Sequence, residues 1–511
     1  MTRSILVVAA TVAIVAAVQA QTPDRGRLST AFSEVDRLMK EYAAQAHAPG
    51  AAWGVIVDGQ LAHTGVTGYR DLATKSPVDS DTVFRIASMT KSFTAMSILK
   101  LRDEGKLSLD GPAERYVPEL AGLKYPTSDA PKITIRHLLS HAEGFPEDNP
   151  WGDRQLADSE DQLSAMLRGG VPFSNAPGLA YEYSNLGFAI LGRVVANVSK
   201  MKYTDYVAAN ILKPLGMTST TLEPKDVPAN RLAKGYRWED ARWKDEPLLS
   251  NGSFGSMGGM LTSVRDLSRY VGVFLSAWPP HDGPETAPIR RASLREMQQV
   301  WRPAPATVTR DAGGAIQLNS GGYAFGLRSS SSCAFRHIVS HTGGLPGFGS
   351  IMMWLPDYGV GMIAFGNVTY TSWTRVTTTA MEAFVKAAGL RPRQPSPAPA
   401  LVDARDKVSR LVAHWDDTLA DSIGAENLFL DQTKDRRRAE IERLLATVGA
   451  CRPDAGPWDN VENALRGFWT MSCEKGKLQV AITLAPTMPP KVQMLGVRVA
   501  PAAPLRQETC P

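Results

Sequence analysis

Strand-like segments at two distant places in the chain, with a long helix-rich stretch between them, constrain its fold most strongly. The early segments are 51–57 and 61–68, joined by Asp58-Gly59, a dipeptide typical of tight hairpins. Residues from about 110 to 310 show mainly helical patterns with long polar connections. The late strand-like segments are 324–328, 335–341, 349–355 and 360–367, with a turn at 356–359.

Amphipathic helices are expected on either side of these strands. One begins near Phe32 and includes Tyr42, and the other runs from about Thr371 to Ala388. Strands and amphipathic helices must bury their apolar faces against each other. We therefore predict an α+β fold: an antiparallel sheet built from both chain ends, flanked by helices, with a helical lobe to one side.

Length and charge exclude some classes of protein. With 511 residues, 43% of them hydrophobic, the chain is long enough for a large core and two domains. The net charge of +5 is mild, and basic residues are spread along the chain except at Arg436-Arg437-Arg438. A nucleic-acid groove needs clustered positive charge, so nucleic acid is not an expected partner.

Residues 1–20 have the pattern of a secretory signal peptide. Arg3 supplies the positive start, an apolar run extends from Ile5 to Val18, and a small-residue cleavage pattern precedes Gln21. The alternative is a membrane anchor, but the run is short for a span of ~20 residues. We expect an exported, periplasmic or secreted protein with no membrane span after signal removal.

The C-terminal part has its own composition. Four prolines between Arg391 and Ala400 predict a linker at 393–402, which separates a catalytic domain, 21–392, from a small α+β domain of unknown role, 403–511. Export permits disulfides, and the preferred pair among the four cysteines is Cys451–Cys473. There is no Cys-x-x-Cys motif, so thiolate metal binding is not expected. The patterns in this domain are helical at 408–419 and 434–448 and strand-like at 467–473, 478–484 and 492–499.

A serine lies where an apolar run passes into a helical pattern. Ser88 follows Val83, Phe84 and Ile86, and Lys91 lies one turn further on and on the same face. In a Ser-x-x-Lys arrangement the lysine helps to remove the proton from a nucleophilic hydroxyl. The spacing alone is weak evidence, because Ser97/Lys100 and Ser199/Lys202 share it.

Two further elements follow Ser88 in order. Of thirteen tyrosines, only Tyr183 has an asparagine two residues later, Asn185, and the pair precedes an apolar helix. His341-Thr342-Gly343-Gly344 ends a strand-like run, where a polar donor and glycines allow close approach to a substrate. His63-Thr64-Gly65 has the same letters but precedes the serine, so we interpret it as coincidence.

These elements resemble those of the serine β-lactamase-related family, which includes class C β-lactamases, penicillin-binding proteins, D-aminopeptidases and esterases. The resemblance covers roughly residues 30–390. Within that range it is reinforced by the segments 133–141, 256–263 and 343–348. It implies a β-lactamase/transpeptidase-like fold with Ser88 as the acylated nucleophile. Lys91 or Tyr183 would be the base, and the letters do not decide between them.

The resemblance also implies the substrate contacts. Asn185 would contact the substrate amide and Lys91, His341, Thr342 and Gly343 would line the substrate, and the backbone N–H groups of Ser88 and Gly344 would form the oxyanion hole. No cofactor and no metal are expected. Two histidines, His137 and His141, have the i, i+4 spacing of zinc ligands, but no His-Glu-x-x-His motif is present and a structural role is favoured.

His341 departs from the family pattern, in which many members have lysine. A histidine with a pKa of ~6.5 is mostly neutral at pH 7 and is a weaker clamp for a substrate carboxylate. We therefore predict an exported serine hydrolase that acts through an acyl-enzyme on small-molecule esters, amides or D-peptides. The alternatives are a β-lactamase or D,D-carboxypeptidase, and a non-catalytic penicillin-binding-like receptor. The oligomeric state is left open.

Overall fold

The computed structural model describes residues 25–310, 314, 316–454 and 456–501. They fall into two compact units, 25–393 and 394–501. The predicted signal segment, 1–20, lies outside the described residues. Within the described ranges, no helix is both long and apolar enough to cross a membrane.

The larger unit is built on a nine-stranded antiparallel sheet. Strand β1 (Gly50–Val57), at the start of the chain, pairs with β13 (Val360–Gly366), at the far end of the unit, with Trp53 opposite Ala364. The prediction that the sheet is built from both chain ends is therefore confirmed. The strand order is β3-β2-β1-β13-β12-β11-β10-β9-β8. The other strands are β2 (Gln60–Asp71), β3 (Ser76–Pro77), β8 (Arg302–Arg310), β9 (Ile316–Tyr323), β10 (Arg328–Ser332), β11 (Ile338–Leu345) and β12 (Phe348–Leu355).

One edge of this sheet differs from the prediction. Strands β8 and β9 were not expected, because they are largely exposed and polar and carry no alternating apolar pattern. Residues 324–328 were predicted as a strand, but 324–327 form the turn between β9 and β10, with Gly326 at φ 64°. Their apolar side chains, Ala324, Phe325 and Leu327, are buried in the core from that turn.

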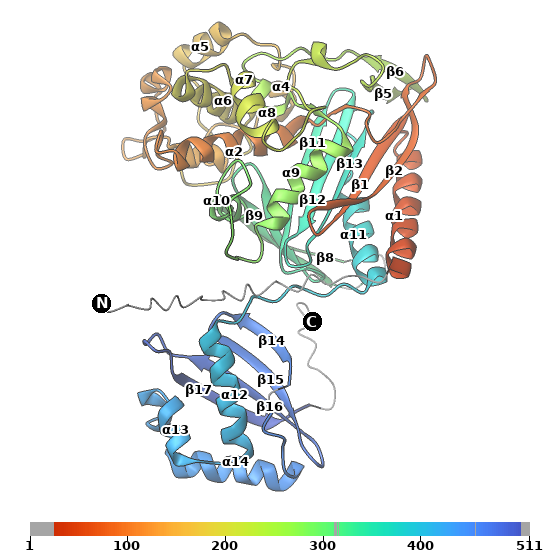
Figure 1. The fold of residues 1–511 in the computed structure, drawn as a ribbon. Coiled ribbons are helices and arrows are strands. Elements are labelled where there is room, and N and C mark those ends of the chain that lie inside the picture. The colour runs from red at the N-terminus through yellow and green to blue at the C-terminus, as the bar shows by residue number, and fades with distance from the viewer. Residues whose placement is uncertain (1–24, 311–313, 315, 455, 502–511) are drawn as a thin grey trace, which may run out of the picture. The chain divides into compact units, whose positions relative to one another are not determined.

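Helices cover both faces of the sheet (Figure 1). Helix α1 (Arg25–Gln45) and helix α11 (Thr374–Ala388) pack against each other on one face and bury Val35, Trp53 and Phe384 between them and the strands. Helix α9 (Val264–Ser276) lies on the opposite face, against β1 and β13.

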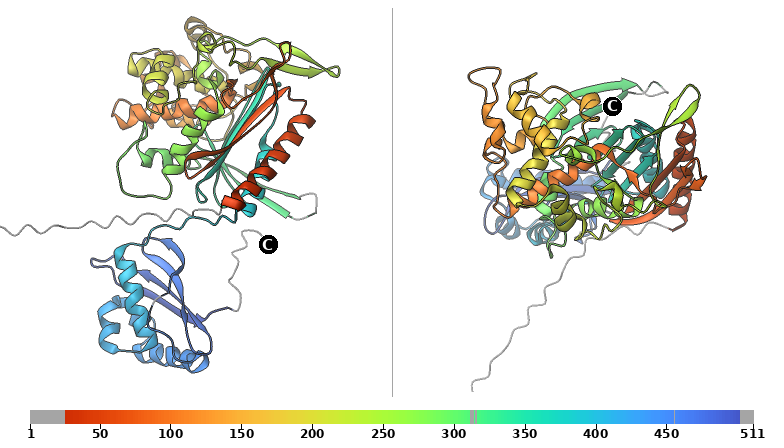
Figure 2. Two further views of the ribbon diagram at one scale, coloured as in Figure 1. Left: turned by 45° about the vertical axis from the view of Figure 1, so that its right-hand side comes forward. Right: turned by 90° about the horizontal axis from the view of Figure 1, so that it is seen from above.

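The remaining helices form a lobe beside the sheet, as both views of Figure 2 show. Helix α2 (Thr90–Asp103) is buried over most of its length and packs against α6 (Asn185–Ser199). A hairpin, β5 (Gly235–Glu239) and β6 (Arg242–Glu246), interrupts this region and was not predicted. The other helices of the lobe and its surroundings are α3 (Ile135–Leu139), α4 (Asn149–Gly152), α5 (Glu160–Gly169), α7 (Tyr203–Val207), α8 (Gly255–Gly258) and α10 (Arg291–Glu296).

The smaller unit has helices packed against a four-stranded antiparallel sheet. The strand order is β14-β15-β16-β17, and the disulfide Cys451–Cys473 is present as predicted. Helix α12 begins at Pro399, so the last residues of the predicted linker 393–402 are helical, because proline fits the first turn of a helix. The elements are α12 (Pro399–Ala413), α13 (Asp417–Ile423), α14 (Lys434–Val448), β14 (Trp458–Asn463), β15 (Arg466–Ser472), β16 (Lys477–Leu484) and β17 (Val492–Val499).

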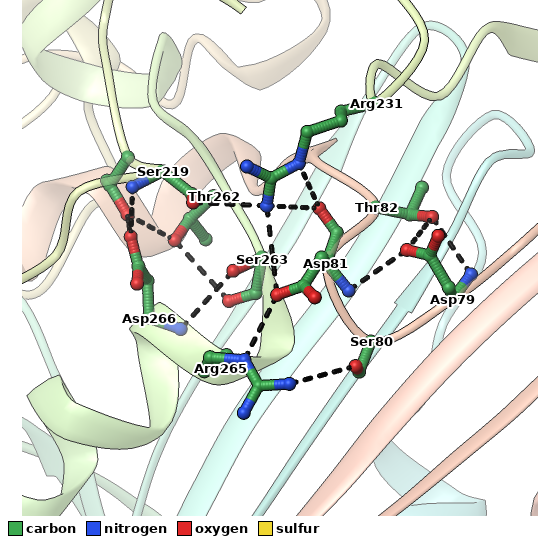
Figure 3. Close-up of polar contacts among 11 residues, drawn as sticks. Asp79, Ser80, Asp81, Thr82, Ser219, Arg231, Thr262, Ser263, Arg265 and Asp266 are labelled. Carbon is green, nitrogen blue, oxygen red and sulfur yellow. Dashed lines mark hydrogen bonds and ion pairs between the residues drawn. The ribbon is translucent and has the colours of Figure 1, made fainter. Parts of the chain in front are cut away.

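A polar cluster in the larger unit holds the strand that leads to Ser88 (Figure 3). Strand β4 (Phe84–Arg85) pairs with β7 (Leu261–Thr262). The Thr262 hydroxyl lies 2.6 Å from that of Thr220, and the buried Asp266 carboxylate accepts from the Thr220 hydroxyl at 2.9 Å and the Ser219 N–H at 2.7 Å. The charge of Asp266 is therefore compensated by donors that also fix β7, and through it β4.

We expect Asp266→Ala to destabilise the larger unit by about 2–3 kcal/mol, because a buried hydroxyl and a partly buried N–H lose a charged acceptor. Arg265→Ala is the matched control: Arg265 precedes Asp266 in α9, and its ion pair with Asp81 is exposed and worth at most about 1 kcal/mol. Pulse proteolysis of the full chain in urea, with mass identification of the surviving fragment, measures both. Equal shifts in the two variants would contradict the assigned role of Asp266.

Candidate active site

Ser88 sits in a single turn of 3-10 helix, Ala87–Met89, directly before α2. The turn follows β4, as the apolar run before the serine predicted. Ala87 has φ 49°, in the left-handed region that non-glycine residues avoid at a cost of about 1–2 kcal/mol. This kink brings the chain from a strand into a helix within a few residues and leaves Ser88 at the positive end of α2.

Lys91 is the most heavily constrained side chain of the site. It is fully buried, and its Nζ lies 3.2 Å from Ser88 Oγ, 2.6 Å from Asn185 Oδ1 and 2.9 Å from the Met257 carbonyl oxygen. Burial lowers the pKa of Lys91 to about 7, against the opposing attraction of nearby carboxylates. Lys91 can therefore lose its proton near neutral pH while it remains in contact with the serine.

Asn185 is held by the start of α6. Its backbone N–H donates to the Asp148 carboxylate at 2.6 Å, and the N–H of Leu186 donates to the other oxygen at 2.9 Å. The side-chain amide donates to Asn149 Oδ1 at 3.2 Å. Asp148 thus caps the helix that points Asn185 at Lys91.

Tyr183 lies beside Lys91, whose ammonium is 4.8 Å from the centre of the tyrosine ring. Ser88 is close enough to the Tyr183 hydroxyl to affect its pKa. Burial raises the pKa of Tyr183 above the ordinary value, and the nearby Ser88 offsets only part of that effect. The pKa values of the two candidate bases therefore shift in opposite directions, because burial disfavours the charged tyrosinate and favours the neutral lysine.

Strand β11 passes directly behind the serine turn. A Cβ at Gly343 would lie 2.1 Å from the Ile86 carbonyl oxygen, and one at Gly344 would lie 2.9 Å from the ring of Tyr370. Both positions need glycine for this close approach. Thr342, on the same strand, is half-buried. The structure thus brings the predicted Gly343 and Gly344 to the turn that carries Ser88.

His341 is buried, and both of its ring nitrogens are occupied. Nδ1 lies 2.6 Å from the Thr342 carbonyl oxygen, which can only accept, and Nε2 lies 2.9 Å from the Tyr323 hydroxyl. The ring therefore donates at Nδ1, and in the neutral ring Nε2 accepts from the Tyr323 hydroxyl. Burial and the nearby Lys91 lower the pKa of His341 to about 3. His341 thus contacts Tyr323, and its lowered pKa favours the neutral ring.

The other two histidines of the region also have internal partners. His137 Nδ1 accepts from the Thr134 N–H at 3.3 Å, and His141 Nδ1 accepts from the Ser184 N–H at 3.1 Å. In the part of the chain that the structure describes, no group of three or more His, Cys, Asp or Glu side chains is placed to hold a metal ion.

Several residues that shape the site were not found from the sequence. Asp148, Asp153, Tyr323 and Tyr370 belong to no motif, and only the fold brings them near Ser88. Asp153 is buried and influences the charge of Lys91, and its carboxylate accepts from the Tyr370 hydroxyl at 3.1 Å.

A family model, Beta-lactamase, matches residues 35–384. The chain belongs to this family. The predicted β-lactamase/transpeptidase-like fold and the resemblance on which it rests are therefore confirmed. The family consists in general of serine hydrolases, so the coarse class of the protein follows.

Individual relatives are distant. Protein flp of Staphylococcus aureus strain N315 is 28% identical over 341 residues, which cover 66% of this chain and 63% of that protein. Beta-lactamase-like protein 2 of Dictyostelium discoideum is 35% identical over 211 residues, 40% of this chain and 38% of the relative. The chain thus spans less than two thirds of the length of these relatives.

A solved structure shares the fold. The octameric penicillin-binding protein homologue from Pyrococcus abyssi has a TM-score of 0.59 with 21% identity, and the match covers 91% of this chain and 89% of that one.

We expect the His341 ring to stay neutral from pH 5 to 8, because its pKa of about 3 lies below that range. Two-dimensional ¹H–¹⁵N spectra of the imidazole groups should show one signal set with the proton on Nδ1 at every pH from 5 to 8. The same signals should be absent from the spectrum of His341→Gln, which assigns them to His341. A titration of that signal set near pH 6.5 would contradict the structure.

Proposed function

We propose that the protein is a serine hydrolase that forms an acyl-enzyme on Ser88 with esters or small amides, D-peptides included. The observation that carries this proposal is the contact of 3.2 Å between Ser88 Oγ and Lys91 Nζ, in a lysine whose pKa is lowered to about 7. A lysine in that state is a base matched to physiological pH.

In the proposed acylation step, neutral Lys91 takes the proton of the Ser88 hydroxyl as Oγ attacks the substrate carbonyl. The resulting oxyanion is stabilised by the backbone N–H groups of Ser88 and Gly344. Tyr183 stays protonated, because burial raises its pKa, and relays a proton to the leaving group. The C–O or C–N bond then breaks, and water hydrolyses the acyl-enzyme. Asn185 keeps Lys91 in place and presents its amide toward the substrate.

The neutral state of His341 supports the choice of substrate. A β-lactam or a peptide C-terminus carries a carboxylate that a fixed cation would bind, and the ring of His341 offers none. Esters and small amides need no such cation. The alternatives remain a β-lactamase or D,D-carboxypeptidase, and a non-catalytic penicillin-binding-like receptor.

We further propose that residues 1–20 direct export, and that 21–392, 393–402 and 403–511 are the catalytic domain, linker and C-terminal domain. The Cys451–Cys473 disulfide supports export, because such bonds persist in oxidising compartments.

Ser88→Ala should abolish both turnover and covalent labelling by a fluorophosphonate, since the attacking hydroxyl is lost. Ser97→Ala is the matched control, because Ser97 is also buried in the same helix region and also precedes a lysine by three residues, yet it donates only to the Phe93 carbonyl. A panel of short-chain nitrophenyl esters, D-amino-acid amides and a chromogenic cephalosporin measures turnover.

Hydrolysis that survives in Ser88→Ala would refute the assignment. Faster cephalosporin than ester turnover would favour the β-lactamase alternative, and labelling without turnover on any substrate would favour the receptor.

The rate of Ser88 labelling should rise with pH through about 7 and level off above it, because only neutral Lys91 accepts the proton. Below the pKa, each pH unit should lower the rate about tenfold. Tyr183→Phe should slow turnover of substrates with poor leaving groups but keep the inflection near pH 7 in the pH dependence of labelling. Lys91→Met should remove this inflection. An inflection that disappears in Tyr183→Phe would make tyrosine the base.

A further inference from the structure

A second polar pair lies beside Gly344 and takes no part in the proposed acylation. Asp153 follows α4 in the helical lobe, and Tyr370 lies between β13 and α11, beyond the end of a central strand of the sheet. The Tyr370 hydroxyl donates to Asp153 Oδ2 at 3.1 Å, and its ring is so close to Gly344 that a Cβ there would lie 2.9 Å away. The pair therefore connects lobe and sheet next to the proposed oxyanion hole.

Asp153 is a buried carboxylate with half of its hydrogen-bonding capacity unused. The residue is 3% exposed, and among the described residues Oδ1 has no hydrogen-bond partner. Within the same ranges, no arginine, lysine or histidine forms an ion pair with it. Burial raises the pKa of Asp153 to about 6, against the attraction of the nearby Lys91 and Arg154. The charge is thus partly compensated, but Oδ1 is a buried acceptor without a donor, and such atoms in native proteins usually have a functional explanation.

The surroundings of Asp153 suit a cation. Asp153 lies close enough to Lys91 and Tyr183 for its charge to affect the pKa of each. The aromatic ring in contact with Asp153, that of Tyr370, belongs to a residue that is 46% exposed, and Trp151, two residues before Asp153 in the chain, is 45% exposed. Aromatic faces next to a carboxylate attract ammonium groups. Tyr370 also has φ 54°, a conformation that non-glycine residues adopt only where the surroundings enforce it.

We propose that Asp153 and Tyr370 form a subsite for a primary ammonium group of the substrate. The ammonium takes the place of the Tyr370 hydroxyl as donor to Asp153 and supplies the missing donor to Oδ1, while the aromatic rings pack against it. This inference rests on the proposed function and narrows its substrates to amine-bearing esters and amides.

A second role for Asp153 must be separated from this one. Its negative charge favours the protonated form of Lys91, so its removal would change the base for every substrate alike. A binding role, by contrast, affects only substrates that carry the ammonium. Two probes of equal shape that differ only in charge distinguish the two roles.

The experiment uses two 4-nitrophenyl phosphonates, one with a 3-aminopropyl chain and one with a butyl chain. Ser88 Oγ attacks phosphorus, the P–O bond to the aryl group breaks, and 4-nitrophenolate leaves, so no later step is required. At pH 7.5 the amine is an ammonium, since alkyl amines have a pKa of ~10. The rate of nitrophenolate release, with intact mass of the adduct, gives the preference for the charged probe.

We expect the full-length protein to prefer the aminopropyl probe and Asp153→Asn to lower that preference about 10- to 100-fold, as for the loss of a charge-assisted hydrogen bond. Tyr370→Phe, which removes the competing hydroxyl but keeps the ring, should raise the preference. Asp161→Asn, the same charge change at an exposed position of α5 in the same lobe, should leave it unchanged.

Equal reaction of both probes in the unaltered protein, or equal slowing of both in Asp153→Asn, would overturn the ammonium subsite while the proposed function stands. Failure of both probes and of a fluorophosphonate to modify Ser88 would instead refute the proposed function, and the subsite with it.

Discussion

The burial of Lys91 is the interaction on which the rest of the site depends. An ammonium group in a protein interior must be surrounded by acceptors or lose its proton. Lys91 has three acceptors, and its pKa is also lowered, so it is partly neutral near pH 7. Its three acceptors come from three separate segments: the serine turn, the start of α6 and the carbonyl of Met257 in α8. The lysine thus ties together segments that are up to 166 residues apart in the chain. The same burial that fixes its position also makes it a usable base.

The strain and close packing around Ser88 follow from the same requirement. The serine must stay within reach of a lysine that cannot move, so the chain turns sharply at Ala87 in spite of the unfavourable φ. Behind this turn, β11 has glycines where any side chain would collide with Ile86 or Tyr370. The Asp266 cluster then holds β4 and β7, and with them the residues just before the turn. Precise placement of one hydroxyl therefore needs contributions from both the sheet and the lobe.

Local pattern was sufficient for the parts of the fold that have strong periodicity. The central strands, the helices α1 and α11 and the order of the elements around Ser88, Tyr183 and His341 were predictable, because their apolar residues repeat at strand or helix spacing. The edge strands β8 and β9 were not, because an exposed edge has no buried face to leave a pattern. The strand predicted at 324–328 was wrong for the opposite reason. Residues 324–327 are apolar because they fill the core from a turn, so they resemble a strand in the sequence.

The polar partners of the site show the same limit. Ser88 and Lys91 share one helix turn, so their spacing is visible in the sequence, as is that of Tyr183 and Asn185. Asp148, Tyr323, Asp153 and Tyr370 reach the site through the fold, and no local pattern marks them. The charge states of the site depend on burial, which a sequence does not give. Burial lowers the pKa of His341 far below its ordinary value and raises the pKa of Tyr183.

These shifts reduce the positive charge that the candidate site offers to a substrate carboxylate. His341 is neutral and Lys91 only partly charged, which leaves Arg328 as the cation that acts on Tyr183 and His341. The carboxylates of Asp148 and Asp153, in contrast, both act on Lys91, and the oxygens of Asp148 are satisfied by helix N–H groups while Asp153 keeps one oxygen without a partner. The unpartnered oxygen of Asp153 is therefore a negative centre near Ser88, and Arg328 is a positive one. If the proposed ammonium subsite is correct, Asp153 favours a cationic substrate, and the histidine at position 341 acts in the same direction because it adds no positive charge.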